Sequence, residues 1–133
     1  SPTEFDRLLV EAVEPRLGWD CPFYMIDYPA AMAALARTPP ADPSIAERWE
    51  LYIAGIELAN AYSELVDSVE QRRRFEACAE LRRSDGRDVY PIDESFLTAL
   101  EAGMPPTAGC ALGIDRLLMV LADTDDIADV IFE

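Results

Sequence analysis

The stretch ERWELYIAGIELANAYSEL, residues 47–65, decides the fold. Arg48 to Ile53 alternates polar and apolar side chains and is rich in strand-forming residues. Ala54-Gly55 can make a two-residue turn, and Ile56 to Glu64 continues as a second strand. The stretch therefore predicts a β-hairpin.

A two-residue turn also predicts the pairing of the two strands. Because side chains alternate between the faces of a strand, Glu50 and Glu57 fall on one face. The opposite face is predicted to be core and carries Leu51, Ile53, Ile56 and Leu58. The expected partners across the hairpin are Ile53 with Ile56, Tyr52 with Glu57, and Glu50 with Ala59.

Two carboxylates on one sheet face repel each other unless a cation joins them. Mg²⁺ bound by one or two carboxylates and by substrate phosphates suits Glu50 and Glu57. The alternative is a solvated sheet face with two ordinary glutamates, and the spacing alone favours that alternative.

The second strand carries a further polar group on one face. Asn60, Tyr62 and Glu64 provide an amide, an aromatic wall and an anion, a set that suits an alkyl ammonium ligand. A plain polar strand face is the alternative. Glu57 and Asn60 are three residues apart, so a regular strand would place them on opposite faces. If both line one site, a β-bulge must lie near Leu58 to Asn60.

The rest of the chain predicts four helices and two more strands. The pattern favours an α+β fold with an antiparallel sheet flanked by helices. Helices are expected at Thr3–Arg16, 67–83, 93–102 and 115–122, strands at Phe23–Tyr28 and 107–114, and a helical turn within 30–37. The first helix is expected to carry one apolar stripe, formed by Phe5, Leu8, Leu9, Ala12 and Val13. The second is expected to face inward with Phe75, Cys78 and Leu81.

Composition excludes several kinds of chemistry. The 133 residues contain no histidine, and all 11 basic residues are arginines. Ser-His-Asp catalysis, a Walker P-loop and a lysine Schiff base are thereby excluded. The net charge of −15 disfavours nucleic-acid binding by this segment. Three widely spaced cysteines predict reduced, mostly buried thiols in a cytoplasmic protein, and no apolar run suits a membrane span or signal peptide.

A third feature lies near the C-terminal end. Gly109 and Gly113 lie on and beside the predicted strand 107–114, where small residues allow a flat ligand to approach the backbone. Arg116 opens the next helix and offers a planar cation for stacking or phosphate contact. A glycine pair before a helix is by itself more often structural.

Together these stretches resemble a known family. Gly109 to Met119 resembles motif 3 of class II aminoacyl-tRNA synthetases, and residues 47–65 resemble the lysine-specific version of that fold. Within the family, the elongation factor P lysine ligases, which are paralogues of lysyl-tRNA synthetase, resemble the chain more. The features that favour these ligases are residues 27–36, residues 55–60, and Ala111, where true synthetases have a glycine. Tyr62 and Ser63 depart from the paralogue pattern, which usually has phenylalanine and histidine.

The resemblance implies a role for each site residue. Glu50 and Glu57 would hold Mg²⁺ against the ATP phosphates. The residues implied to bind ATP are Glu57, Leu58, Gly113 and Arg116, and those implied to bind the amino acid are Asn60, Tyr62, Glu64 and Ala111. Glu64 would receive an amino group, and the Ala111 methyl would narrow the pocket floor, which favours a differently shaped lysine such as β-lysine.

The implied activity is ATP-dependent activation of lysine or a lysine isomer as an adenylate, for transfer to elongation factor P. The alternatives are a fragment of a lysine–tRNA ligase that acts on tRNA-Lys, and a non-catalytic remnant that binds a nucleotide or a partner. Residues 1–133 would form the C-terminal part of a catalytic domain, without motifs 1 and 2. The chain alone is therefore expected to be inactive, and full-length family members are expected to be homodimers.

Overall fold

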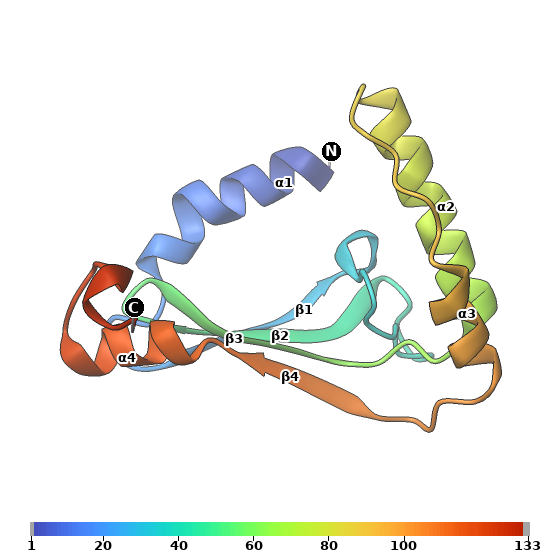
Figure 1. Cartoon of the computed structure of the whole chain (residues 1–133). Coiled ribbons are helices and arrows are strands. Elements are labelled where there is room, and N and C mark those ends of the chain that lie inside the picture. Colours follow the sequence, from blue (N-terminus) through green and yellow to red (C-terminus); the bar gives the residue numbers. More distant parts are fainter. Residues whose placement is uncertain (1, 132–133) are drawn as a thin grey trace.

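The computed structural model describes residues 2–131, with side chains from residue 4 onward. Four antiparallel strands form one sheet in the order β1-β2-β3-β4 (Figure 1). Their bounds are Phe23–Pro29 (β1), Ile45–Ile53 (β2), Ile56–Ser63 (β3) and Ala108–Leu112 (β4). The predicted α+β fold with an antiparallel sheet is confirmed.

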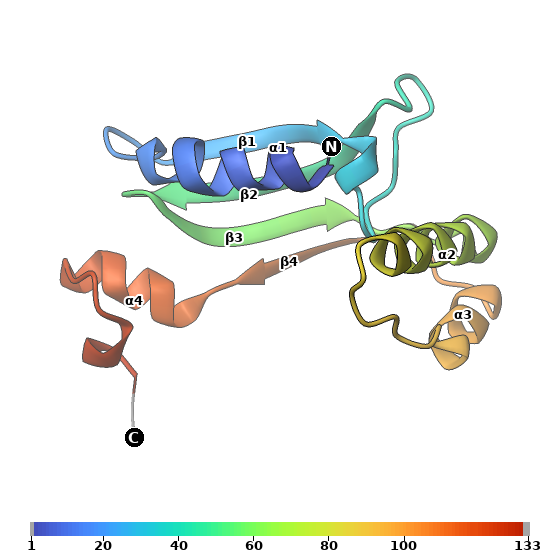
Figure 2. The ribbon, with the colours of Figure 1, turned by 90° about the horizontal axis from the view of Figure 1, so that it is seen from above.

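Helices lie around this sheet and beyond its ends. Helix α2 and helix α3 stand at one end of the strands and α4 at the other (Figures 1 and 2). The α-helices are Pro2–Leu8 (α1), Ser68–Ser84 (α2), Glu94–Glu101 (α3) and Ile114–Ala122 (α4). Short turns of other helix types are Leu9–Val13 (η1), Glu14–Arg16 (η2), Ala30–Met32 (η3) and Ile127–Asp129 (η4). No helix in the described part of the chain has the length and apolarity that crossing a membrane requires.

The N-terminal segment differs from the regular helix predicted for residues 3–16. It winds as α-helix only to Leu8, then as a π-helix to Val13 and a 3-10 turn to Arg16. Pro15 has no N–H to donate to the preceding turn, which explains the irregular end. Of the predicted apolar stripe only Leu9 is buried, and the other four residues are exposed.

The hairpin turn forms where the sequence predicts it. Ala54 and Gly55 both have positive φ, 51° and 77°, as a type I′ turn requires. Their amides donate to the carbonyls of Gly18 and Leu17 at 2.9 and 2.8 Å. A Cβ at residue 18 would lie 2.3 Å from the carbonyl oxygen of Tyr52, so only glycine fits this approach. The segment after α1 is thereby fixed against the tip of the hairpin.

A β-bulge changes the predicted pairing within the hairpin. Tyr52 pairs with Glu57 as expected, but Leu51 pairs with Ala59, which leaves Leu58 as the extra residue. Glu50 consequently pairs with Asn60, and the predicted pairing with Ala59 is wrong. The bulge predicted near Leu58 to Asn60 is confirmed.

The bulge leaves both glutamates on the predicted face, but the burial of the two faces differs from expectation. Glu50 and Tyr52 alternate on β2, and Tyr52 pairs with Glu57, so the three side chains share a face. That face holds the fully buried Tyr52 and a Glu50 that is 5% exposed. On the opposite, predicted core face, Leu51 is only half-buried. Ile53 and Ile56 are likewise half-buried, and Leu58, in the bulge, is buried.

The prediction of which α2 residues face the interior is also wrong. Cys78 and Leu81 are exposed and Phe75 is half-buried, while Gln71 is the one buried residue of this helix. Helix α2 projects beyond the sheet and packs against the short α3 (Figure 1), so little of its surface is covered. All three cysteines of the chain are free and exposed, which corrects the prediction of buried thiols.

Candidate functional site

The predicted site residues gather on one face of β2, β3 and β4. Strand pairing places Glu50, Asn60 and Ala111 in one cross-strand row. The neighbouring row holds Arg48, Tyr62 and Gly109. Because directly paired residues share a face, both rows point to the same side of the sheet. The N-terminal helical segment runs along β1 and β2 on one side of the sheet, leaving β3 and β4 beside it (Figures 1 and 2).

Glu50 is the centre of a buried hydrogen-bond network. Its Oε2 accepts from the hydroxyls of Tyr28 and Tyr52, the latter at 2.6 Å. Its Oε1 accepts from Arg48 Nη2 at 2.5 Å and from Asn60 Nδ2 at 2.8 Å. A carboxylate offers about four lone-pair positions. The four donors therefore satisfy this buried anion completely.

The two tyrosine hydroxyls act as donors because both stay protonated. Burial, followed by the hydrogen bond to the Glu50 carboxylate, raises the pKa of Tyr28 and of Tyr52 far above the ordinary value. A negative phenolate beside Glu50 would be both desolvated and repelled. The two hydroxyls therefore remain hydrogen-bond donors across the physiological pH range.

A further carboxylate, Glu14, approaches this network from η2. Burial raises the pKa of Glu14, and a hydrogen bond with Tyr52 lowers it by a smaller amount. The negative charges of Glu50 and Glu57 raise its pKa further. Its place beside the hairpin follows from the docking of residues 17 and 18 on the turn.

A cavity of about 430 Å³ lies next to this network, along β3 and β4. Its lining residues are Asn60, Tyr62, Glu64, Gly109, Cys110 and Ala111. The structure thus brings together all four residues that the sequence assigns to the amino acid. Glu64 is half-buried, and no described residue forms a hydrogen bond or ion pair with its carboxylate. A Cβ at residue 109 would lie 2.7 Å from Glu64 Oε1, so the glycine makes room for this carboxylate.

The four residues assigned to ATP lie together at the hairpin end of β3. Arg116 Nη1 donates to the carbonyl oxygen of Glu57 at 2.9 Å and to its carboxylate at 3.3 Å. The amide of Gly113 donates to the carbonyl oxygen of Leu58 at 2.8 Å. These bonds fix the start of α4 against the bulge. The Arg116 side chain remains 51% exposed, so its guanidinium is open to a further anion.

The two glutamates assigned to magnesium differ in their surroundings. Among the described residues, no three His, Cys, Asp or Glu side chains come together as a metal site. A magnesium ion that takes most of its ligands from phosphates and water needs only one or two carboxylates. Glu57 is about one-third exposed, and Arg116 is the one partner of its carboxylate in the described part of the chain, so it fits such a role. Glu50 would have to exchange at least one of its four donors for the ion, and its assignment stays a prediction.

Several participants of the site, including Arg48 and Tyr28, are not among the residues predicted from the sequence. Arg48 lies two residues before Glu50, so alternation alone could have placed it on the same face. Tyr28 lies on β1, which pairs with β2 through a register that no local pattern fixes. Asp27 has a φ of 58°, which breaks the alternation of β1 there, so that Ile26 is 60% exposed and Tyr28 only 4%.

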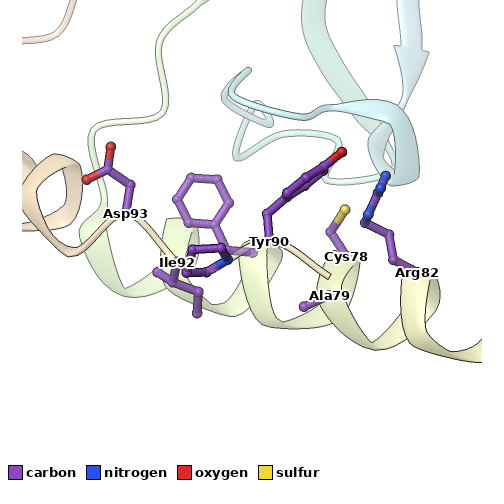
Figure 3. A pocket seen from close by; sticks show the side chains of 8 residues that line it. Cys78, Ala79, Arg82, Tyr90, Ile92 and Asp93 are labelled. Atoms are coloured by element: carbon purple, nitrogen blue, oxygen red, sulfur yellow. The ribbon is translucent and has the colours of Figure 1, made fainter. Parts of the chain in front are cut away.

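A second cavity, of about 250 Å³, lies away from these residues between α2 and the segment before α3 (Figure 3). Tyr90 and Arg82 stack across it, with 4.7 Å from the guanidinium carbon to the ring centroid. Cys78 and Ala79 also line it. None of the residues that the sequence assigns to a site belongs to this cavity.

The whole sheet lies in the part of the chain that the model of a known protein family matches. The model of the class II tRNA synthetases (D, K and N) matches residues 3–132. The chain belongs to this family. It forms part of a class II synthetase domain, since it spans well under half the length of the relatives described next.

The similar curated proteins divide between two kinds of lysine ligase. The elongation factor P–(R)-β-lysine ligase of Haemophilus influenzae (strain PittGG) is 48% identical over 93% of this chain and 38% of its own length. The corresponding ligase of Erwinia tasmaniensis is 48% identical over 97% of this chain and 40% of its own length. The lysine–tRNA ligase of Anaeromyxobacter sp. (strain K) is also 48% identical, over 89% of this chain and 23% of its own length. Identity alone does not separate the two kinds.

Proposed function

We propose that this class II synthetase segment serves ATP-dependent activation of lysine or a lysine isomer as an adenylate, for transfer to a lysine of elongation factor P. The observation that carries the proposal is the Glu64 carboxylate. It is half-buried at the cavity and has no partner among the described residues. A desolvated carboxylate without a cation is costly, and a substrate ammonium group would remove that cost.

The cavity supports a defined orientation of the amino acid. The functional residues Glu57, Asn60 and Tyr62 follow one another along β3, and Glu64 comes directly after the strand ends at Ser63. An ammonium group at Glu64 places the alkyl stem along Tyr62 and directs the substrate carboxylate toward Asn60 and the hairpin end. The reacting carboxylate then lies on the side of Glu57 and Arg116, where we place ATP. Catalysis would consist mainly of positioning and of neutralising charge.

We assign ATP to the group formed by Glu57, Leu58, Gly113 and Arg116. Arg116 would stack on the base or contact a phosphate through its exposed guanidinium. Glu57, and Glu50 after release of a donor, would hold Mg²⁺ on the phosphates. When bound, the ion supplies neutralisation of the phosphate charge.

For the acceptor we favour elongation factor P over tRNA-Lys. Ala111 supports this choice, because the resemblance implies a glycine at that position in true synthetases. The net charge of −15 also disfavours contact of this segment with RNA phosphates. Lysine–tRNA ligation is the second candidate, supported by relatives of equal identity. In either case we expect a homodimer in the cytoplasm, as the family resemblance implies.

The test is ATP–pyrophosphate exchange by the natural protein that contains this chain, at its full length. Exchange should depend on lysine or β-lysine, and Glu64→Gln should reduce it by about 100-fold, since a charged partner is lost. The matched control is Glu76→Gln, because Glu76 is an exposed glutamate on α2. No exchange with either amino acid would favour a non-catalytic remnant, and transfer to tRNA-Lys instead of elongation factor P would favour the second candidate.

A further inference from the structure

The Arg48 side chain contacts four groups that come from four parts of the fold. Its Nη2 donates to Glu50 Oε1 at 2.5 Å, and its Nε donates to Asn60 Oδ1 at 3.3 Å. Its Nη1 donates to the carbonyl oxygen of Met32, in η3, at 3.1 Å. The guanidinium carbon lies 4.5 Å from the ring centroid of Tyr28, on β1. Its side chain is 19% exposed, so these contacts are formed largely out of water.

These contacts fix which way the Asn60 amide points. Arginine only donates hydrogen bonds and an ionised carboxylate only accepts them. The Asn60 oxygen must therefore face Arg48, and its nitrogen must face Glu50, to which Nδ2 donates at 2.8 Å. One N–H of the amide remains unused by this pair, and Asn60 lines the cavity. A flipped amide would place two donors against each other at Arg48 and two acceptors at Glu50.

We propose that Arg48 is a positioning residue of the amino-acid pocket, which locks the Asn60 amide so that its remaining N–H donates to a substrate oxygen. The inference rests on the proposed function, because it assigns the cavity to an amino acid. Arg48 itself need not touch the substrate. Its planar fork reaches Glu50, Asn60 and Met32 at once, which a lysine ammonium on a flexible stem cannot reproduce.

The experiment measures KM for lysine and for ATP by pyrophosphate exchange in the full-length protein. Arg48→Lys keeps a positive charge next to the buried Glu50 and should therefore fold. We expect it to raise KM for lysine about 10-fold, the cost of losing one positioned hydrogen bond. KM for ATP should rise less than KM for lysine, because the lysine keeps a cation beside Glu50 and none of the Arg48 contacts involves the Glu57–Arg116 group. Arg37→Lys is the matched control, since Arg37 is an exposed arginine whose side chain pairs with Glu47 outside the cavity.

A double variant separates positioning from general stability. If Arg48 acts through Asn60, Asn60→Ala should raise KM for lysine, and adding Arg48→Lys should raise it less than about twofold further. Three results would overturn the inference and leave the proposed function intact. The effects of Asn60→Ala and Arg48→Lys on KM for lysine could multiply, the KM values for lysine and ATP could rise in parallel, or KM for lysine in Arg48→Lys could equal that in Arg37→Lys. A wild-type protein without exchange would overturn the proposed function instead. In that case neutron crystal structures of the wild type and Arg48→Lys, which show the amide hydrogens, still decide the positioning step, since an unchanged Asn60 amide in the variant contradicts it.

Discussion

Replacing Gly109 with alanine tests the position of the Glu64 carboxylate. Gly109 has no positive φ in the structure, so alanine meets no backbone strain there. The added Cβ would lie 2.7 Å from Glu64 Oε1, and the carbon of the carboxylate would be 3.9 Å away. The substitution therefore acts on one side-chain oxygen, which must move.

The required movement sets the size of the effect. Ordinary contact begins at 3.4 Å, so the oxygen must retreat by about 0.7 Å. A misplacement of about 1 Å in a binding group can reduce activity up to 100-fold. We expect KM for lysine to rise about 10-fold, which corresponds to about 1.4 kcal/mol. KM for ATP should change little, because Glu64 follows the end of β3, whereas the Glu57–Arg116 group lies at its start.

Pyrophosphate exchange with varied lysine and fixed ATP measures this difference. Gly113→Ala is the contrasting variant, because its Cβ would meet Arg116 Cδ at 3.4 Å in the group assigned to ATP, and it should leave KM for lysine unchanged. Shortening the glutamate should relieve the clash. KM for lysine in the double variant Gly109→Ala/Glu64→Asp should therefore be scarcely higher than in Glu64→Asp alone. The steric argument would be refuted if the two substitutions raised KM for lysine by independent factors that multiply. A normal KM for lysine in Gly109→Ala would also refute it.

Three further predictions follow from other contacts. Glu70→Gln should lower the free energy of unfolding at pH 7 by about 1 kcal/mol, since hydrogen bonds from Arg73 and Arg74 lower the pKa of Glu70 to about 2. The wild type has this stability above pH 4.5 and loses it as the pH falls toward 2, so the two proteins should converge in acid urea titrations. Ala111→Gly should raise the exchange rate with α-lysine relative to β-lysine, by up to about 10-fold for one methyl group, and an unchanged ratio would contradict a role in the pocket. Tyr52→Phe should destabilise the fold by about 1.5–3 kcal/mol in urea unfolding, because a buried carboxylate loses a donor.

The parts of the fold that the sequence predicts are those fixed by local chemistry. The hairpin follows from alternation and from a turn at Ala54-Gly55, both of which need only neighbouring residues. Asp67 and Asp93 cap α2 and α3 through their own carboxylates, which is again a local interaction. The bulge is the informative case, because the requirement that Glu57 and Asn60 share a site predicts it before any backbone geometry is known.

The parts that the sequence does not predict depend on distant partners. The burial of Glu50 requires Tyr28, which is 22 residues away and reaches it through the irregularity at Asp27. Nothing in the spacing of β2 shows that this carboxylate has four donors. The apolar stripe of α1 has the right period, but a period says which residues share a face and does not say what covers it.

One extra residue in β3 unites the two halves of the site. In a regular strand, alternation would put Glu57 with Ala59 and Ala61, on the face opposite to Asn60. The residues assigned to ATP and those assigned to lysine would then lie on opposite sides of the sheet, where no reaction between their ligands could occur. Leu58 is the extra residue that lets Glu57 and Asn60 share a face of the sheet. Its carbonyl accepts a hydrogen bond from the amide of Gly113, which brings α4 and Arg116 next to Glu57. The bulge is thus the backbone feature that the proposed chemistry requires, and it explains why a buried leucine stands between two functional residues.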